Sequence, residues 1–316
     1  MSRSTLICMQ KIKKFHGLNR MWDMYIMLIP GLFFILLFNY LPMYGAIIAF
    51  KDYNIFAGNN PIDAINKSEW VGFLYWHKLW MQTDFRQAFN NTLIISIMKI
   101  GIGFPIPILL ALLINELKNI FFKRSVQTAL YLPHFMSWAV VGALFLSILS
   151  TGGPINSIIN KLGGTTIPFF MNSQWFRWIL LFTSIWKESG WNSIVYLAAI
   201  SGIPPELYEA AIVDGASRFQ QIRFITFPGI SSTIVMLLIL RLGGLMEAGF
   251  SQILVMYNPT VYNVSDIIGT YVYRVGLGQL NFSMGTAVGL FNSIVSFLLV
   301  MSSNLLCKRV FERSIW

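Results

Sequence analysis

Charged side chains are scarce in this sequence of 316 residues: only 11% are Asp, Glu, Lys or Arg, whereas 55% are hydrophobic. Soluble domains usually carry about 25% charged residues, so too little charge is present to cover a surface that faces water. The scarcity excludes a cytosolic enzyme, a secreted disulfide scaffold and a disordered regulator. The apolar excess predicts a protein whose surface faces lipid.

Cysteine and histidine are also few, which excludes the usual metal and disulfide frameworks. Cys8 and Cys307 lie near opposite ends of the chain, and His16, His77 and His134 form no cluster in the sequence. Neither set has the spacing of metal ligands or of a disulfide scaffold. We therefore expect no metal site.

Long apolar runs are abundant. The first begins near Met24 and has no small-residue cleavage site after it, so we expect an uncleaved first span rather than a signal peptide. Six segments are long enough to cross a bilayer. They are 24–50, 88–115, 125–149, 176–200, 229–256 and 282–307. The fourth is the least apolar, because Lys187 and Glu188 interrupt it.

Basic residues are placed unevenly. The N-terminal tail (1–23), the loops after the second and fourth segments, and the C-terminal tail (308–316) together hold 13 of the 23. Because Lys and Arg collect on the cytoplasmic side, both termini are expected in the cytoplasm. The fold class expected is an all-α integral membrane domain with six transmembrane helices over 24–307. In the outer loop 51–87, the Trp and Tyr side chains form either an interfacial belt or a docking surface for an external partner.

The cytoplasmic loop 201–228 predicts a pair of short helices. Pro204-Pro205 opens the first, since proline is tolerated in a first turn. Asp214-Gly215 ends it, because glycine adopts a left-handed conformation readily, and a second helix is expected over 216–224. Leu207, Tyr208, Ala211 and Ile212 are expected to share one face. An exposed apolar face needs a protein partner; alternatively, the segment lies on lipid head groups.

The same loop contains a long gapped motif: Glu209-Ala-Ala, then Gly215, Ile225 and Phe227-Pro228. The motif resembles the EAA loop of bacterial ABC-importer permeases, in which leucine occupies the position of Phe227. Other segments resemble the oligosaccharide and polysaccharide branch of the carbohydrate-uptake class. They begin at Ile29, Tyr44, Asn91, Asn115, Trp186, Tyr257, Thr270 and Ala287.

This resemblance implies a type I ABC importer permease fold in the plasma membrane of a bacterium. It implies a transport subunit rather than an enzyme, taking up oligosaccharides or polysaccharide fragments. The partners implied are a second homologous permease subunit, two cytoplasmic ATPase subunits and an extracellular solute-binding lipoprotein, with no nucleic acid. The sequence lacks a Gly-x-x-x-x-Gly-Lys-Ser/Thr phosphate loop, so ATP and Mg²⁺ are expected on the partner subunits and no cofactor on this chain.

By the same resemblance, the helix pair docks in a groove of an ATPase subunit. Glu209 would pair with a basic group there, small side chains would allow close approach, and Gly215 would form the turn. The coupling residues implied are Tyr208, Glu209, Ala210, Ala211, Asp214, Gly215 and Arg218.

Charged residues inside spans are costly and indicate functional positions. A sugar path needs hydrogen-bonding groups for hydroxyls and aromatic faces for apolar sugar surfaces. The residues predicted to line it are Trp186, Lys187, Glu188, Trp191, Asn192, Glu247 and Asn292; those on the fourth span could equally face a partner permease. Lys99 and Arg241 either form structural ion pairs inside the bundle or also line the path.

Two other functional classes fit the same composition. One is a secondary transporter driven by an ion gradient, which the charged residues inside the spans would suit but in which the docking loop has no purpose. The other is an assembly or sensor protein that binds an ATPase without transporting anything.

Overall fold

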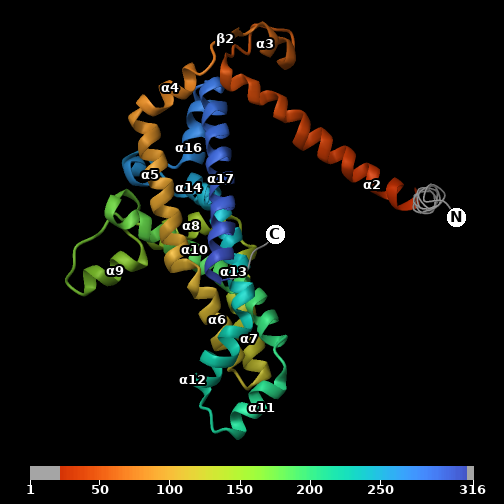
Figure 1. Cartoon of the computed structure of the whole chain (residues 1–316). Coiled ribbons are helices and arrows are strands. Elements are labelled where there is room, and N and C mark those ends of the chain that lie inside the picture. Colours follow the sequence, from red (N-terminus) through yellow and green to blue (C-terminus); the bar gives the residue numbers. More distant parts are fainter. Residues whose placement is uncertain (1–21, 312–316) are drawn as a thin grey trace, which may run out of the picture. The chain divides into compact units, whose positions relative to one another are not determined.

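The computed structural model describes residues 22–311 and is built mainly from helices (Figure 1). The chain divides into two compact units, Met1–Gly72 and Phe73–Trp316. The predicted N-terminal tail (1–23) therefore lies almost wholly outside the described residues. Of the predicted C-terminal tail (308–316), only residues 308–311 are described, as the end of the last helix.

In the N-terminal unit, one long apolar helix accounts for the first predicted span. It comprises α2 (Trp22–Ile35), a π-helical turn (Leu36–Tyr40) and a 3-10 segment (Leu41–Phe50). Met24–Phe50 is long and apolar enough to cross a membrane. Pro42 stands at the start of the 3-10 segment, where its missing N–H removes one α-helical hydrogen bond.

A small folded loop follows in the same unit. Two short strands, β1 (Lys51–Asp52) and β2 (Glu69–Trp70), pair antiparallel on either side of α3 (Pro61–Lys67). The ammonium of Lys51 donates to the carbonyls of Ile65, at 2.6 Å, and Ser68, at 3.2 Å. The ring of Phe50 stacks on Trp70, so this part of the predicted outer loop has a defined structure of its own.

The C-terminal unit contains the remaining helices. They are α4 (Leu74–Met81), α5 (Thr83–Met98), α6 (Pro105–Asn115), α7 (Ile120–Tyr131), α8 (Trp138–Ile148), α9 (Pro154–Lys161), α10 (Ser173–Ser201), α11 (Pro205–Val213), α12 (Arg218–Gln221), α13 (Phe227–Gly243), α14 (Phe250–Met256), α15 (Tyr262–Ser265), α16 (Ile268–Val272) and α17 (Phe282–Phe311). Helices α11 and α12 lie at one end of this unit, and α4 and α16 lie toward the other (Figure 1).

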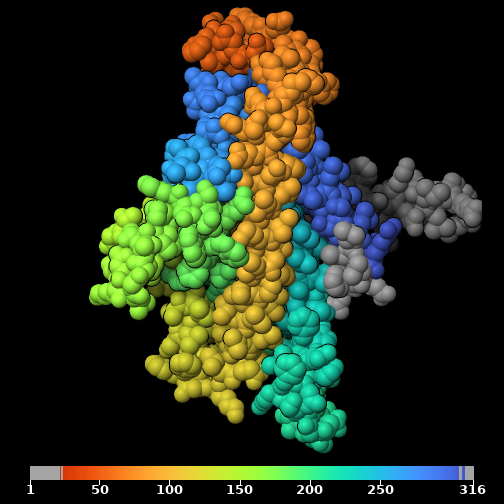
Figure 2. Space-filling view, turned by 90° about the vertical axis from the view of Figure 1, so that its left-hand side faces the viewer, coloured from red at the N-terminus to blue at the C-terminus, as the bar shows by residue number. Residues whose placement is uncertain are grey.

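The second predicted span is a single rod. Helices α5 and α6 are joined by a π-helical turn, Lys99–Gly103, and together they form a spanning candidate over Thr83–Asn115. The turn lies directly before Pro105, which cannot donate a backbone hydrogen bond. In the space-filling view, α5 and α6 run as one continuous column (Figure 2). The proline-rich stretch therefore changes the local helix type without breaking the rod.

The third and fifth predicted spans are each interrupted. Within 125–149, α7 and α8 meet at an angle of 103°. Within 229–256, α13 ends at Gly243 and α14 begins at Phe250, with Ala248 and Gly249 both at positive φ. The sequence indicated neither break, because hydropathy measures apolar length and does not register a local break in the backbone.

Within residues 22–311, four helices are long and apolar enough to cross a membrane, and α7 with α8 makes five if the bent pair counts as one span. Helix α10 is not among them. At 29 residues it is about 43 Å long, which exceeds the thickness of a bilayer core. Its mean hydropathy is low because it contains polar and charged residues, among them Lys187 and Glu188 of the fourth predicted span.

Helix α10 packs against α6, α7 and α13. Its contact with α7 is close: a Cβ built on Gly190 would collide with the carbonyl of Leu130. A core cluster joins α10 to α8 and α14 through Leu180, Val141 and Ile253, all fully buried. This packing positions the broken fifth segment beside α10.

Helix α17 packs against α13 and against the π-helical segment Tyr273–Gly278. Gly285 faces Gly276 so closely that a Cβ on Gly285 would collide with its Cα. A Cβ on Gly289 would meet no atom within 4 Å. Among the described residues, the close contact on this helix is therefore made at Gly285 and not at Gly289.

Candidate functional site

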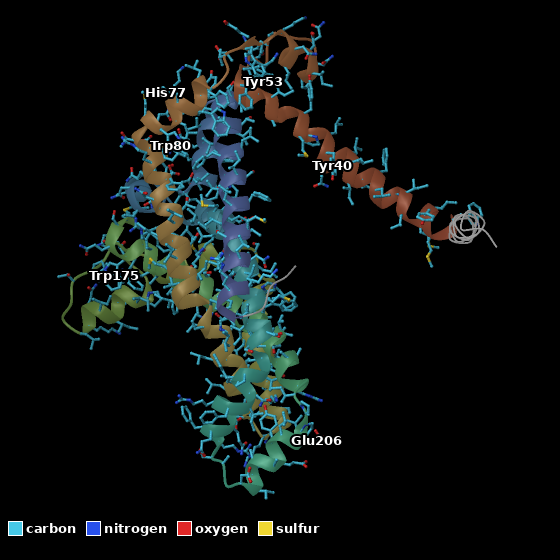
Figure 3. The ribbon with its side chains drawn as sticks, viewed as in Figure 1. Tyr40, Tyr53, His77, Trp80, Trp175 and Glu206 are labelled. Atoms are coloured by element: carbon cyan, nitrogen blue, oxygen red, sulfur yellow. The ribbon has the colours of Figure 1, made fainter. Side chains whose placement is uncertain are left out.

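The helix pair predicted in loop 201–228 is present. Helix α11 begins at Pro205 and has Glu206 in its first turn, labelled in Figure 3. Negative charge is favoured at a helix N-terminus because the unpaired N–H groups of the first turn point outward there. The predicted start of the first helix is confirmed.

The turn that ends α11 depends on one glycine. Gly215 has a φ of +77°, and no atom lies within 4 Å of a Cβ built there. The N–H of Ala216 donates to Ala211 O at 2.8 Å, and the N–H of Gly215 donates to Ile212 O at 3.0 Å. These two bonds form a Schellman motif, in which a left-handed residue ends the helix. Glycine is needed here for its backbone conformation and not for lack of space.

The second helix begins later than expected. Ser217 caps α12: its side chain accepts the Gln220 N–H, and the Gln220 side chain accepts the Ser217 N–H. Such a reciprocal capping box fixes a helix start, so α12 begins at Arg218 rather than at residue 216. A π-helical turn, Ile222–Thr226, then leads directly into α13.

The helix pair presents exposed apolar side chains. Leu207, Ile212, Val213, Phe219 and Phe224 are each at least half exposed. The expected common face is divided, since Tyr208 and Ala211 are only partly exposed whereas Leu207 and Ile212 are open.

The polar members of the predicted coupling set are accessible. Glu209, Asp214 and Arg218 are exposed. Within residues 22–311, the Glu209 carboxylate has no hydrogen-bond or ion-pair partner. Ala210 is exposed beside it, and Ala211 is partly buried. The arrangement leaves an acidic group and a small side chain together on an open helix face.

Tyr208 joins the helix pair to the spanning helix. Its phenolic oxygen lies 2.9 Å from Oγ1 of Thr226, which is buried at the end of the π-helical turn. Gln221, also buried, donates to the carbonyl of Ala216 at 3.1 Å. Beside these contacts lies a cavity of about 270 Å³, lined by Tyr208, Arg218 and Thr226 among others. The helix pair is thus braced against the start of α13.

A second polar region surrounds the break between α13 and α14. The ammonium of Lys99, in the π-helical turn after α5, donates to Ala248 O at 2.9 Å and to Gln252 Oε1 at 2.5 Å. Gln252 is fully buried and donates to Leu180 O and Thr183 Oγ1, both at 2.7 Å. A Cβ on Gly249 would collide with the Lys99 ammonium. Lys99 thus bonds the unwound backbone while Gln252 connects it to α10.

A cavity of about 570 Å³ opens beside this break. Its lining includes two cations and two carboxylates, as well as an aromatic ring: Lys99, Arg241, Glu188, Glu247 and Trp138. Arg241 donates to Glu188 at 3.2 Å. Glu247 is exposed, and the described residues offer its carboxylate no hydrogen-bond or ion-pair partner. Charged and aromatic groups therefore converge on one cavity.

Three of the seven predicted path residues lie at this cavity or next to it. Glu188 and Glu247 line it, and Asn192 lines a smaller neighbouring cavity together with Arg241.

The structure places the other four away from the cavity. Trp186 packs edge-on against Phe145, and Trp191 stacks on the ring of His134 at 4.6 Å. The buried Lys187 donates to His134 O at 2.6 Å. Asn292, on α17, lines none of the cavities described here, and its buried Oδ1 has no hydrogen-bond partner among residues 22–311.

Lys99 and Arg241, for which the sequence left a structural role open, line the cavity beside Glu188. Their charge inside predicted spans was the signal that could have selected them. Trp138 and Gln252 were missed, and nothing in the local sequence distinguishes them from ordinary core residues. The junction of α8, α10 and the broken segment is what brings them to the cavity.

The sequence of this chain is similar to those of known transport proteins. Residues 103–314 match the family described as "Binding-protein-dependent transport system inner membrane component". A polygalacturonan/rhamnogalacturonan transport system permease protein, YteP of Bacillus subtilis (strain 168), is 45% identical over 294 residues, covering 93% of this chain and 90% of the relative. Protein LplB of the same organism is 44% identical over 287 residues, covering 90% and 88%.

The fold of this chain is also similar to that of permease chains in solved ABC transporter structures. The crystal structure of a bacterial ABC transporter involved in the import of the acidic polysaccharide alginate contains a chain 40% identical to this one. It superposes with a TM-score of 0.86, covering 94% of this chain and 99% of that one. A bacterial alginate ABC transporter in complex with an alginate pentasaccharide-bound periplasmic protein gives a TM-score of 0.87 at 40% identity, covering 95% and 99%.

Proposed function

Because the chain belongs to the family of binding-protein-dependent transport system inner membrane components, we propose that it is the permease subunit of an ABC importer. Its cargo is an oligosaccharide or a fragment of a polysaccharide. The chain is a transport subunit rather than an enzyme, and ATP and Mg²⁺ bind to separate ATPase subunits. The similarity to the polygalacturonan/rhamnogalacturonan permease YteP supports the choice of cargo.

The topology proposed is a type I importer domain with six spans and both termini in the cytoplasm of a bacterium. Four apolar helices and the bent α7–α8 pair support five spans. The length of α10 supports a sixth, since neighbouring helices can shield its polar residues from lipid. The basic residues gathered in the tails and in two loops support the orientation.

Coupling to ATP hydrolysis takes place at the helix pair. The observation that carries this proposal is the exposed α11, which has an open carboxylate at Glu209 and is bonded to the start of α13 through Tyr208 and Thr226. An ATPase subunit that binds α11 and moves it would therefore also displace the N-terminal end of α13. ATP then biases an element with two states, inward-open and outward-open.

The sugar path includes the 570 Å³ cavity at the break of the fifth segment. Its carboxylates and ammonium groups can bond to sugar hydroxyls, and Trp138 offers a ring face for apolar sugar surfaces. Irregular backbone at membrane depth is tolerated where it lines a cavity. This fits the stretch from Gly244 to Gly249, in which a single 3-10 turn, Leu245–Glu247, is followed by two residues at positive φ.

The proposed partners complete the transporter. A second, homologous permease subunit would form a heterodimer with this chain, two ATPase subunits would bind on the cytoplasmic side, and an extracellular solute-binding lipoprotein would deliver the sugar. The outer loop 51–87 is proposed as part of its docking surface. The complex of the alginate transporter with its sugar-bound periplasmic protein supports this assembly.

Reconstitution in proteoliposomes tests the proposed function. Uptake of a labelled oligosaccharide should require ATP inside the vesicle, both permease chains, the ATPase subunits and the binding protein outside. Uptake driven by an ion gradient without ATPase subunits would contradict the proposal and favour a secondary transporter. A screen of the cognate binding protein against an oligosaccharide panel would identify which sugar to use.

A further inference from the structure

The cavity beside the α13–α14 break has hydrogen-bonding capacity that the protein itself does not use. Its four charged side chains are two cations and two carboxylates, so their sum does not favour a ligand of either sign. The four side chains differ in how many of their hydrogen-bonding groups are already used within the protein. The two cations retain unused donors, and one of the carboxylates retains both of its oxygens.

Lys99 is held by neutral oxygens. Its ammonium has three donors, of which two are directed at the carbonyl of Ala248 and the side-chain oxygen of Gln252. Within residues 22–311, no carboxylate lies within ion-pair distance of it. Taking a cation out of water is costly unless an opposite charge compensates it. A negatively charged group on a ligand would supply that charge at the free third donor.

Arg241 is paired weakly enough to accept a second anion. It makes one bond to Glu188 at 3.2 Å, and the side chains of the two residues are 51% and 30% exposed. Exposed ion pairs contribute little free energy because water screens them. A guanidinium has five N–H donors and binds carboxylates in a bidentate manner, so most of its donors are open to a ligand.

Glu247 would bond to the other end of such a ligand. It is exposed, lines the same cavity and has no bonding partner among the described residues. Its oxygens only accept hydrogen bonds when ionised, so they suit sugar hydroxyls and repel a carboxylate. The cavity therefore offers donors with positive charge at Lys99 and Arg241, and an acceptor for hydroxyls at Glu247.

From this arrangement we propose that the cavity selects sugars that carry a carboxylate, that is, oligosaccharides containing uronic acid residues. The sugar carboxylate binds to Lys99 and Arg241, and its hydroxyls donate to Glu247. This inference rests on the proposed function, because it requires the cavity to lie on the sugar path. A neutral sugar reaches the same cavity but adds no negative charge, so that the carboxylate of Glu188 alone faces the two cations Lys99 and Arg241.

A pair of ligands that differ only in charge tests the proposal on the unmodified protein. The complex of both permease chains with the ATPase subunits is purified without the binding protein. Binding of trigalacturonate and of its methyl ester is then measured by calorimetry. The free acid should bind at least about tenfold more tightly, since bonds between charged groups are the stronger class.

Three outcomes are distinguishable in that experiment. Preference for the free acid that weakens as salt is raised supports the inference. Equal binding of the acid and the ester overturns the inference and leaves the sugar path in place. Binding of neither ligand overturns both the inference and the proposed path.

Variants assign the preference to the two cations. Lys99→Gln and Arg241→Gln should each weaken binding of the free acid about tenfold and change binding of the methyl ester by less than about twofold. Lys161→Gln, which removes a positive charge from the exposed end of α9, is the matched control and should change neither. If both cavity variants keep the wild-type preference for the acid, Lys99 and Arg241 do not bind the carboxylate.

Discussion

The phenolic oxygen of Tyr208 lies 2.9 Å from Oγ1 of Thr226, and this hydrogen bond joins the exposed helix α11 to the base of α13. In the described chain it is the only side-chain hydrogen bond that α11 makes. Helix α11 has no buried residue of its own, so a force applied to it has few routes into the membrane helices. The hydrogen bond between Tyr208 and Thr226 is therefore the candidate link through which a movement of α11 reaches α13.

Removing one hydroxyl should loosen that link. Tyr208→Phe should reduce the amount of sugar transported per ATP hydrolysed by about two- to tenfold, matching the net free energy of about 0.5–1.5 kcal/mol for one hydrogen bond. Uptake and ATPase activity measured in the same proteoliposomes give this ratio. Ser231→Ala is the control, because the Ser231 hydroxyl bonds only within its own turn, to Pro228 O. An unchanged ratio in Tyr208→Phe would show that transmission follows another route.

Gly215 should tolerate only residues that accept a left-handed backbone. Gly215→Val should destabilise the turn by about 1–2 kcal/mol, because Cβ clashes with the backbone at positive φ, and should abolish uptake while membrane insertion persists. Gly215→Asn should retain most of the uptake, since asparagine adopts this conformation more easily. Sugar uptake by both variants, and the amount of each variant in the membrane fraction measured by immunoblot, test this prediction. Equal loss in the two would contradict a conformational requirement and point to space instead, although no atom lies within 4 Å of the added Cβ.

Reversing the charge at Glu209 should release the ATPase subunits. Glu209→Lys places a cation where the open carboxylate is proposed to meet a basic group, and like charges repel at an interface. Co-purification of the ATPase should fall at least about tenfold while the permease still inserts. Glu206→Lys, one turn earlier on the same exposed helix, is the comparison and should bind more ATPase than Glu209→Lys. Normal co-purification and normal uptake in Glu209→Lys would contradict the coupling role.

A methyl group at Gly190 should destabilise the bundle. The Cβ of Gly190→Ala would collide with the backbone of Leu130 and push α10 away from α7, a type of overpacking that costs about 1–3 kcal/mol. Thermal unfolding in detergent measures this as a lower Tm. Gly289→Ala, where a Cβ meets no atom within 4 Å, should leave Tm nearly unchanged. Equal Tm values for the two variants would refute the close α10–α7 contact.

Much of the structure of loop 201–228 followed from local chemistry. Proline at the start of α11 and glycine at its end act through their own backbone geometry, which neighbouring elements do not override. Helix α12 starts two residues later than predicted, because the reciprocal capping box of Ser217 and Gln220 fixes its first residue at Arg218. The division of the apolar face of α11 was not predictable, since it depends on Tyr208 reaching Thr226, 18 residues away.

The cavity shows the opposite balance. Glu188 and Glu247 were predicted from charge within apolar runs, but Lys187 and Trp191 on the same helix point to His134 instead. Helical spacing limits which residues share a face and does not say which face meets a cavity. That choice depended on how α10 packs against its neighbours.

By itself, the sequence predicted apolar segments long enough to cross a membrane, and it located the start of α11 and the glycine turn that ends it. Each of these depends on composition or on interactions between residues close in the chain. Only the tertiary structure decided that Lys99, Glu188, Arg241 and Glu247 line one cavity. Those four residues come from separate segments, and the break after Gly243 that opens beside them is held by bonds from Lys99 and Gln252. Contacts across so many residues are set by packing, which no local pattern encodes.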